Sequence, residues 1–308
     1  MGSGYGFGKT ILFNEHFVVY GIPAIASAIN YKTIARVERG EKDAFEDRRK
    51  GTAGYSQAKM AQQMEAISII KRELSINDGL HIVLEGDLPA FSGIGASAAN
   101  SVAIARAMVD EYKLNLSDEE INKIAYKAEK AFAGTPSGID NTVATYGGLI
   151  WFRRSADPYS DELPLVERIR TKPFDMLLAN SGVVADTKKV IEGVRERREK
   201  DREAYDKIFA QAESIAHEAR KALETNDLEK AGRLMNEDHR LLQQIGVSSD
   251  VLDNMVELAL KAGAPGAKLT GGGVGGCMIA LTPGNQQKVE EVFKNAGFET
   301  LRITVGGE

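Results

Sequence analysis

Hydrophobic residues recur at helical spacing along several stretches of the chain. From Ala98 they follow at steps of four and three residues, at Ala98, Val102, Ala105, Val109 and Tyr112. This spacing places them on one face of an α-helix. Comparable patterns predict helices over 57–74, 228–245, 249–262 and 286–296, and a long, largely exposed helix or a pair of helices over 187–224.

One more helix has a clear start. Ser117 and Glu120 form a capping box, in which each side chain bonds the backbone N–H of the other residue. Glu129 lies ~40° around the helix from Ala125 and therefore borders the apolar stripe. A carboxylate there can face inward, or it can be a solvated residue at the helix edge. The predicted stripe is Ile121, Ile124, Ala125, Ala128 and Phe132.

Short apolar runs between these helices predict strands. They lie at 24–29, 33–37, 80–85, 146–152, 175–180, 267–270, 277–281 and 300–305, and 9–13 with 17–20 predicts two short strands or a strand and a turn. The polar segment 38–55 is expected to be a loop or hairpin. The charged segment 153–172 contains the expected domain boundary, which divides the chain into 1–170 and 171–308. Short strands with helices on one face predict an α+β sandwich.

Composition narrows the possible partners. The 308 residues carry a net charge of −5, which argues against general binding to nucleic acid or to anionic membranes. An anionic substrate would need a local basic site. Cys277 is the only cysteine, so one chain has no disulfide framework. Without a run of 18 apolar residues or a signal-peptide pattern, a cytoplasmic protein is expected.

A glycine-rich segment, Ser92 to Ala99 (SGIGASAA), leads into the helix that starts near Ala98. Such a turn presents free backbone N–H groups and the positive end of the helix dipole, and phosphate commonly binds there. Ser97 adds a hydroxyl that can reach a phosphate-bound cation. The segment matches neither the P-loop nor the dinucleotide-binding pattern. Taken alone, it is also compatible with a tight turn before a helix.

Two other segments have unusual turn composition. Residues 134–141 (GTPSGIDN) form a turn of Gly, Pro and Ser that leads to Asp140. Residues 268–277 (KLTGGGVGGC) contain five glycines within six positions between two predicted strands. This glycine density indicates backbone that approaches a ligand closely, whereas a flexible hairpin connection rarely needs so many.

A fourth segment, residues 8–16 (GKTILFNEH), places Lys9, Glu15 and His16 around one short strand. Each of these residues is a weak signal by itself, because a single Lys or His near a terminus is usually a surface residue. Their significance depends on the other three segments.

Together, these segments resemble the sequence motifs of the GHMP kinases. Residues 8–21 resemble the first motif of a member of that family, and 89–99 resemble its PxxxGLGSSAA phosphate loop. Residues 134–141 resemble GNPSGVDN, and 268–277 resemble KLTGAGGGGC. A weaker likeness covers 180–195 and 235–247. The resemblance spans nearly the whole chain.

The resemblance implies a fold and an activity. The fold is two α+β domains, a ribosomal S5 domain 2-like N-terminal domain and a ferredoxin-like C-terminal domain, with the active site between them. The activity is transfer of phosphate from ATP, with Mg²⁺, to the 5-hydroxyl of mevalonate. Phosphomevalonate, homoserine or a sugar are alternative acceptors, and a non-catalytic nucleotide-binding sensor is an alternative of another class. A homodimer is also implied.

The resemblance also implies roles for single residues. Asp140 would be the general base or charge partner of the substrate hydroxyl, with Lys9 beside it. Glu129 and Ser97 would bind magnesium. The nucleotide phosphates would lie against Pro89, Ser92, Gly93, Ile94, Gly95, Ala96, Ser97 and Ala98. The substrate would contact Glu15, His16, Thr187, Gly271, Gly272 and Gly273.

The chain departs from the family pattern at four positions. Phe7 precedes Gly8 where proline is usual, and Asn14 replaces a common glycine. Ala96 stands for the first serine of a Ser-Ser pair, and Val274 interrupts the last glycine run. None of these changes removes Lys9, Glu129 or Asp140, the residues on which phosphoryl transfer would depend.

Overall fold

A computed structural model describes residues 1–51, 54–90, 93–133, 136–157, 164–184 and 187–307. The chain forms two compact units, each assembled from separate segments. Unit 1 consists of Met1–Lys9, Ala28–Phe91 and Gly95–Gly147, and unit 2 of Thr10–Ser27, Ser92–Ile94 and Gly148–Glu308. The content of both units confirms the α+β prediction.

Unit 1 has a sheet whose strands follow the order β3-β4-β2, and β1 also pairs with β2. β2 is antiparallel to β4, whereas β3 is parallel to β4. The two strands predicted over 24–37 are one continuous strand. The segment 38–55, expected to be a loop or hairpin, contains the end of this strand and the short strand β3, which pairs with β4. The bounds are β1 (Gly2–Phe13), β2 (Ala24–Gly40), β3 (Ala44–Asp47) and β4 (Gly79–Gly86).

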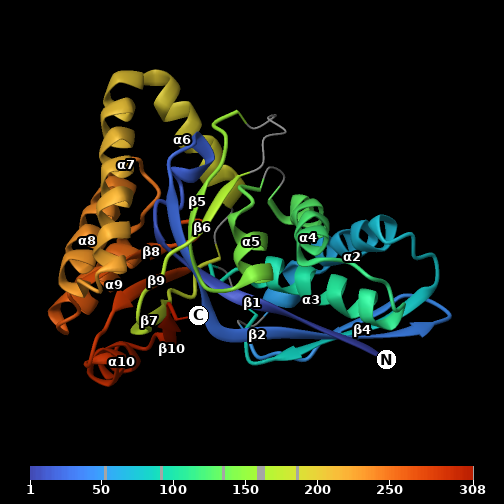
Figure 1. Ribbon diagram of the computed structural model, residues 1–308. Helices are drawn as coiled ribbons and strands as arrows, with labels where there is room; N and C mark the ends of the chain where they lie inside the picture. Colours follow the sequence, from blue (N-terminus) through green and yellow to red (C-terminus); the bar gives the residue numbers. More distant parts are fainter. Residues whose placement is uncertain (52–53, 91–92, 134–135, 158–163, 185–186, 308) are drawn as a thin grey trace. The chain divides into compact units, whose positions relative to one another are not determined.

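The described part of unit 1 also contains five helices, of which α2, α3 and α4 lie on one side of β2 and β4 (Figure 1). Their apolar faces pack with these strands in one core that includes Ile67, Val102 and Ile124. Ala98 and Ala105 are fully buried, as the helical spacing predicts. The bounds are α1 (Tyr55–Ala58), α2 (Met60–Glu73), α3 (Ala96–Glu111), α4 (Asp118–Ala133) and α5 (Ile139–Tyr146).

Two predictions made around α4 and α5 differ in their result: the capping box is present, whereas the start of the following strand is not where it was predicted. The capping box is confirmed, since the Ser117 backbone N–H donates to Glu120 Oε2 at 2.7 Å and the Glu120 N–H donates to Ser117 Oγ at 3.3 Å. The strand predicted from 146 begins at 149 instead, because Tyr146 ends α5. Gly147 and Gly148 separate the two elements with φ of +67° and +72°, which only glycine adopts without strain.

Unit 2 contains a four-stranded antiparallel sheet with the order β10-β7-β9-β8. Its strands match the four predicted near the C-terminal end of the chain. A second set of pairings joins β6 to β5, and β5 to the first four residues of β2. The bounds are β5 (Leu149–Arg153), β6 (Leu165–Arg168), β7 (Phe174–Asn180), β8 (Gly266–Thr270), β9 (Cys277–Leu281) and β10 (Glu299–Val305).

The helices of unit 2 confirm the predicted helical pair, although α7 buries Tyr205 and Phe209 and is less exposed than expected. Residues 18–20 form a short 3₁₀ helix and not a strand, so the turn was the correct alternative. Among the described residues, no helix is long and apolar enough to cross a membrane. The bounds are η1 (Val18–Tyr20), α6 (Thr187–Lys200), α7 (Arg202–Glu224), α8 (Leu228–Gln244), α9 (Asp250–Lys261) and α10 (Gln286–Asn295).

Candidate active site

Lys9 and Asp140 form an ion pair in unit 1. Lys9 lies on β1, and Asp140 lies in the first turn of α5, two residues after the glycine N-cap Gly138. Lys9 Nζ is 2.7 Å from Asp140 Oδ1, and the two side chains are 5% and 37% exposed. The lysine is therefore buried, whereas the carboxylate keeps an accessible side. A turn of Gly, Pro and Ser before a helix places an acidic residue at this helix start, where the dipole stabilises its charge.

Glu129 of α4 faces inward beside this pair, so the inward-facing alternative is correct. Its carboxylate accepts hydrogen bonds from Ser97 Oγ at 3.0 Å and from Ser101 Oγ at 3.4 Å. Burial and the nearby charge of Asp140 raise the pKa of Glu129 to about 8, although both serines and Lys9 favour the ionised form. A buried carboxyl with two hydroxyls around it is an oxygen-rich position for a cation.

The N-terminus of α3 lies against the same lysine. Gly95 is the N-cap residue with φ of +69°, and a Cβ built there would lie 2.6 Å from Lys9 Cγ. The side chain of Lys9 therefore passes where only glycine leaves room. The first N–H groups of α3, from Ala96 to Ala98, have no partner within the helix. Pro89 is half-buried on the approach to this loop, and Ser92 lies outside the described residues.

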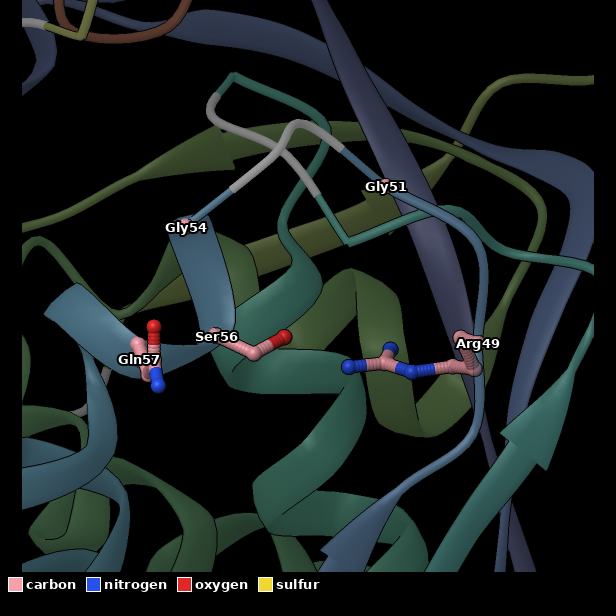
Figure 2. A pocket seen from close by; sticks show the side chains of 5 residues that line it. All are labelled: Arg49, Gly51, Gly54, Ser56 and Gln57. Atoms are coloured by element: carbon pink, nitrogen blue, oxygen red, sulfur yellow. The ribbon is translucent and has the colours of Figure 1, made fainter.

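A pocket beside the start of α3 is lined by Ala96, Ser97 and Asn100 together with Phe45 and Phe132. A second pocket, of about 220 Å³, is lined by Arg49, Gly51, Gly54, Ser56 and Gln57. Figure 2 shows the Arg49 side chain pointing across this pocket toward Ser56. Neither pocket was predictable from the sequence, because the lining residues come from the segment expected to be a loop or hairpin and from separate helices.

A chain of hydrogen bonds connects the two pockets. Arg49 bonds both oxygens of Asp47, at 2.9 and 2.8 Å, and donates to Thr33 Oγ1 at 2.7 Å. Thr33 Oγ1 donates to Asn100 Oδ1 at 3.2 Å, and Asn100 Nδ2 donates to Gln63 Oε1 at 3.0 Å. Gln63 is buried, and its Nε2 has no partner among the described residues. Gln63 is also one of the residues that line the pocket beside α3.

In unit 2, two glycine segments come into close contact. A Cβ on Gly271 would lie 2.9 Å from the Cα of Gly93, and both glycines have positive φ. A Cβ on Gly273 would overlap the carbonyl oxygen of Val247. These glycines therefore allow close contact between protein segments, and the approach of this backbone to a ligand stays a prediction. The backbone of Gly272 also bonds His16.

His16 is buried in unit 2, and its Nε2 has no hydrogen-bond partner among the described residues. Burial, together with the charge of Lys268, lowers the pKa of His16 to about 4. The ring is therefore neutral at physiological pH, with one nitrogen unpartnered. Glu15 is fully buried and pairs with Lys268. Thr187 is the first residue of α6.

Three residues with contacts at these positions were not singled out from the sequence. Ser101 lies one helical turn after Ser97, and this spacing on a predicted helix was a usable signal. Lys268 is the first residue of the glycine-rich segment 268–277, but the sequence does not indicate that it forms an ion pair with Glu15. Asp238 lies within the predicted helix over 228–245, where nothing in the local pattern marks it as buried.

The departures from the family pattern have visible backbone consequences. Asn14 and Val274 have φ of +69° and +62°, the left-handed region that favours glycine. Asn tolerates this region better than a β-branched valine does. Phe7 packs edge-on against Tyr5, with ring centroids 5.5 Å apart, and faces Gly147. Ala96 is buried in the first turn of α3, where it leaves Ser97 as the hydroxyl nearest Glu129.

Comparison with protein families matches both halves of the chain. Residues 60–148 match the family described as the GHMP kinases N terminal domain, and residues 219–299 match the GHMP kinases C terminal family. The mevalonate kinase of Pyrococcus abyssi is 34% identical over 313 residues, which cover 94% of this chain and 91% of that protein. The mevalonate kinase of Aeropyrum pernix is 35% identical and covers 89% and 86%.

Comparison with solved structures also finds kinases of mevalonate and phosphomevalonate. The crystal structure of L. major mevalonate kinase in complex with R-mevalonate has a TM-score of 0.92 and 35% identity, and covers 100% of this chain and 97% of that one. A phosphomevalonate kinase of Streptococcus pneumoniae has a TM-score of 0.78 at 14% identity, and covers 98% and 100%. At this lower identity the likeness shows the fold alone.

Proposed function

The chain belongs to the GHMP kinase family, within its mevalonate kinase branch, and on this premise we propose that it transfers the γ-phosphoryl group of ATP to the 5-hydroxyl of mevalonate. The observation that carries the proposal is the Lys9–Asp140 ion pair, which lies beside Glu129 at the start of α3. A phosphoryl-transfer site needs an anion cradle, a metal carboxylate and a group that receives the hydroxyl proton. Unit 1 supplies a candidate for each.

Asp140 is the proposed acceptor of the hydroxyl proton. As the mevalonate oxygen bonds to the γ-phosphorus, its proton passes to the Asp140 carboxylate and the bond from phosphorus to the β,γ-bridging oxygen breaks, which releases ADP. Lys9, 2.7 Å from Asp140, supplies positive charge that favours the attacking oxygen as it loses its proton. The accessible side of Asp140 gives the hydroxyl room to approach.

Magnesium fits the side chains around Glu129. Mg²⁺ prefers carboxylate and hydroxyl oxygens and usually takes its remaining ligands from water and substrate phosphates. Glu129 and Ser97 offer one oxygen of each kind, 3.0 Å apart. The raised pKa of Glu129 supports the assignment, since a buried carboxylate without a cation is costly. When bound, the ion would neutralise charge on the phosphates.

The proposed positions for ATP follow from the α3 N-terminus. Its free N–H groups would receive the phosphates, without the lysine of a P-loop. The adjacent pockets are the proposed site for the nucleoside, because they continue from Ser97 to a space lined by Arg49 and Ser56. The free donor Gln63 Nε2 suits an acceptor such as a purine ring nitrogen or a ribose oxygen.

The residues proposed for the mevalonate side come from unit 2. His16 presents a neutral ring with an unpartnered nitrogen, which suits a hydrogen bond with a substrate hydroxyl or carboxylate. Thr187 and the backbone of Gly271–Gly273 remain proposed contacts on the strength of the family motifs. Residues Gly93 and Ile94 continue the proposed phosphate loop. A homodimer and a cytoplasmic location are further proposals of the same kind.

The test is an ADP-release assay with Mg-ATP and, in turn, mevalonate, phosphomevalonate, homoserine and galactose. Turnover with mevalonate alone is the expected result. Preference for another acceptor would retain the kinase chemistry and replace the substrate. Binding of ATP without ADP release on any acceptor would contradict the proposed function and favour a nucleotide sensor.

A further inference from the structure

A buried cluster of one lysine and two carboxylates lies in unit 2. Lys268 Nζ is 2.6 and 2.5 Å from the two oxygens of Glu15 and 3.3 Å from Asp238 Oδ2. It also donates to the backbone carbonyl of Leu269 at 2.8 Å. All three side chains are 0% exposed. None of them can reach solvent or a bound ligand without a rearrangement of the protein.

The cluster connects three segments that are distant in sequence. Glu15 directly follows β1, Asp238 lies on α8, and Lys268 lies on β8. The backbone N–H of Asn14 donates to Asp238 Oδ2 at 3.2 Å, and the Asn14 side chain bonds the carbonyls of Pro23 and Ala212. Hydrogen bonds of both its backbone N–H and its side chain thus stabilise the left-handed conformation of Asn14.

The three charged residues are close in sequence to the histidines and glycines of this region. Glu15 precedes His16, and Asp238 precedes His239, whose Nδ1 accepts from the Leu269 N–H at 3.4 Å. Lys268 leads through Thr270 into Gly271–Gly273, and the backbone of Gly272 bonds the His16 ring. A shift in the cluster would therefore move both the histidine and the glycine segment.

The electrostatics of the region agree with a fixed, neutral His16. Burial is the main cause that lowers the pKa of His16 and of His239 to about 4, and the charge of Lys268 acts in the same direction. Burial raises the pKa of Glu15 to about 7, against the opposing effect of Lys268. The other charges that act on the two histidines are Arg197 of α6, on His16, and Asp253 of α9, on His239.

Taken together, the geometry points to Glu15, Lys268 and Asp238 as positioning residues, which fix the orientation of His16 and of Gly271–Gly273 for the acceptor substrate and do not bind that substrate themselves. The inference rests on the proposed function for the identity of the substrate. For Glu15, which the family motif associates with substrate contact, it assigns an indirect role.

Glu15→Gln is the variant that tests this role. The amide has nearly the same shape, and Lys268 still has Asp238 as a charged partner, so the protein is expected to fold. Weaker pairing would loosen His16. For residues that support metal ligands, loss of the supporting contact typically costs about 10- to 100-fold in affinity or activity, and we expect an effect at the lower end of this range. We expect the KM for mevalonate to rise about tenfold, with kcat and the KM for ATP changed by less than about twofold.

Glu290→Gln is a matched control in the same unit. Glu290 of α10 is also a buried carboxylate with charged partners, Arg302 at 2.6 Å and Lys294 at 3.0 Å. None of the contacts described for it involves His16 or the glycine segment. This variant is expected to lose stability and to keep the KM for mevalonate. An equal KM in Glu15→Gln and in the wild type would overturn the positioning role.

A second measurement does not depend on turnover. The chain has only four histidines, so the ring ¹⁵N signals of His16 can be assigned. We expect Glu15→Gln and Asp238→Asn to shift these signals, and Glu290→Gln to leave them unchanged. Unchanged His16 signals in the first two variants would refute the inference. If the wild type released no ADP with mevalonate, the proposed function would fail, while this spectrum would still decide the positioning role.

Discussion

Units 1 and 2 each contain one lysine with two nearby carboxylates, and the two clusters differ in exposure. In unit 1, Lys9 pairs with Asp140, which is 37% exposed, and Glu129 lies close by. In unit 2, Lys268 pairs with Glu15 and Asp238, and all three are sealed. The same three charges can therefore serve different purposes. An exposed carboxylate can exchange a proton with a substrate, whereas a sealed one can only fix the position of its neighbours.

The largest expected effect is on the exposed carboxylate. Asp140→Asn removes the proton acceptor and keeps the shape, and general-base catalysis contributes about 10²- to 10⁴-fold to rate. We expect kcat to fall by a factor in this range while the Kd for Mg-ATP stays within about threefold. ADP release and calorimetric titration of ATP measure the two quantities.

Asp43→Asn is the matched control for this change. Asp43 is 39% exposed and pairs with Lys71 at 2.7 Å, nearly the geometry of Asp140 and Lys9. It lies in unit 1, outside the residues proposed for catalysis, and its loss should leave kcat unchanged. If Asp140→Asn lost ATP binding while remaining folded, Asp140 would belong to the nucleotide and not to the acceptor hydroxyl.

A substitution in the buried Lys268 cluster is expected to lower the free energy of unfolding. Lys268→Met leaves two buried carboxylates without a cation, and breaking a buried ion pair in this way costs about 3–5 kcal/mol. Lys71→Met, which removes the partner of a carboxylate that solvent reaches, should cost less than about 1 kcal/mol. Urea unfolding of both variants measures the difference. Equal losses would mean that burial does not distinguish the two kinds of pair.

The pH dependence of stability offers a finer comparison. Glu129 has its pKa raised to about 8 in the folded protein, so between its unfolded value of 4.5 and 8 the folded state binds the extra proton. Its contribution to stability is therefore present at low pH and is lost as pH rises, with a slope on the order of 1 kcal/mol per pH unit.

Glu129→Gln removes this dependence. Relative to the wild type, the variant should gain stability between pH 5 and pH 8, as measured by urea unfolding in the absence of metal and nucleotide. A constant difference between Glu129→Gln and the wild type over this range would contradict the raised pKa.

The smallest effect is expected at Gly95. Alanine there adopts φ of +69° and brings Cβ to 2.6 Å from Lys9 Cγ, so it combines backbone strain with a displaced lysine. Gly284, with φ of +74° and nothing within 4 Å of a Cβ, is a control for strain alone. Each alanine should cost about 1–2 kcal/mol of stability, but only Gly95→Ala should lower kcat. An equal kcat in Gly95→Ala and Gly284→Ala would show that the Lys9 side chain moves away from the added Cβ without loss of activity.

Periodic and capping signals predicted much of the fold. The stripe on α3, the capping box before α4 and the apolar runs of the last strands depend on neighbours in sequence, so the local pattern was sufficient. The start of β5 was misplaced because the aromatic Tyr146 fits a strand pattern, although it is the last residue of α5. Gly147 and Gly148, which have positive φ, separate α5 from β5. The helix α5 itself was missed because Gly, Pro and Ser dominate the segment before it.

The candidate site was predictable only in part. The motifs named Lys9, Asp140, Glu129 and Ser97, and the structure brings each pair together. Which carboxylate would be exposed was not predictable, because burial of Glu15 depends on Lys268, more than 250 residues away in sequence. Likewise, Asn14 and Val274 differ from the family glycines in side chain but retain the left-handed backbone, which is a property of the surrounding fold.

The hydrogen-bond chain from Arg49 to Gln63 runs in one direction. A guanidinium only donates, so Thr33 accepts from Arg49; Thr33 in turn donates to Asn100 Oδ1, and Asn100 Nδ2 donates to Gln63 Oε1. Because Oε1 of Gln63 is the atom that accepts this bond, the NH₂ group is the end of the side chain left without a partner among the described residues. A deaza-purine nucleotide, in which C–H replaces a ring nitrogen, would leave that NH₂ group unanswered, and a series of such analogues can identify which atom of the base it reads.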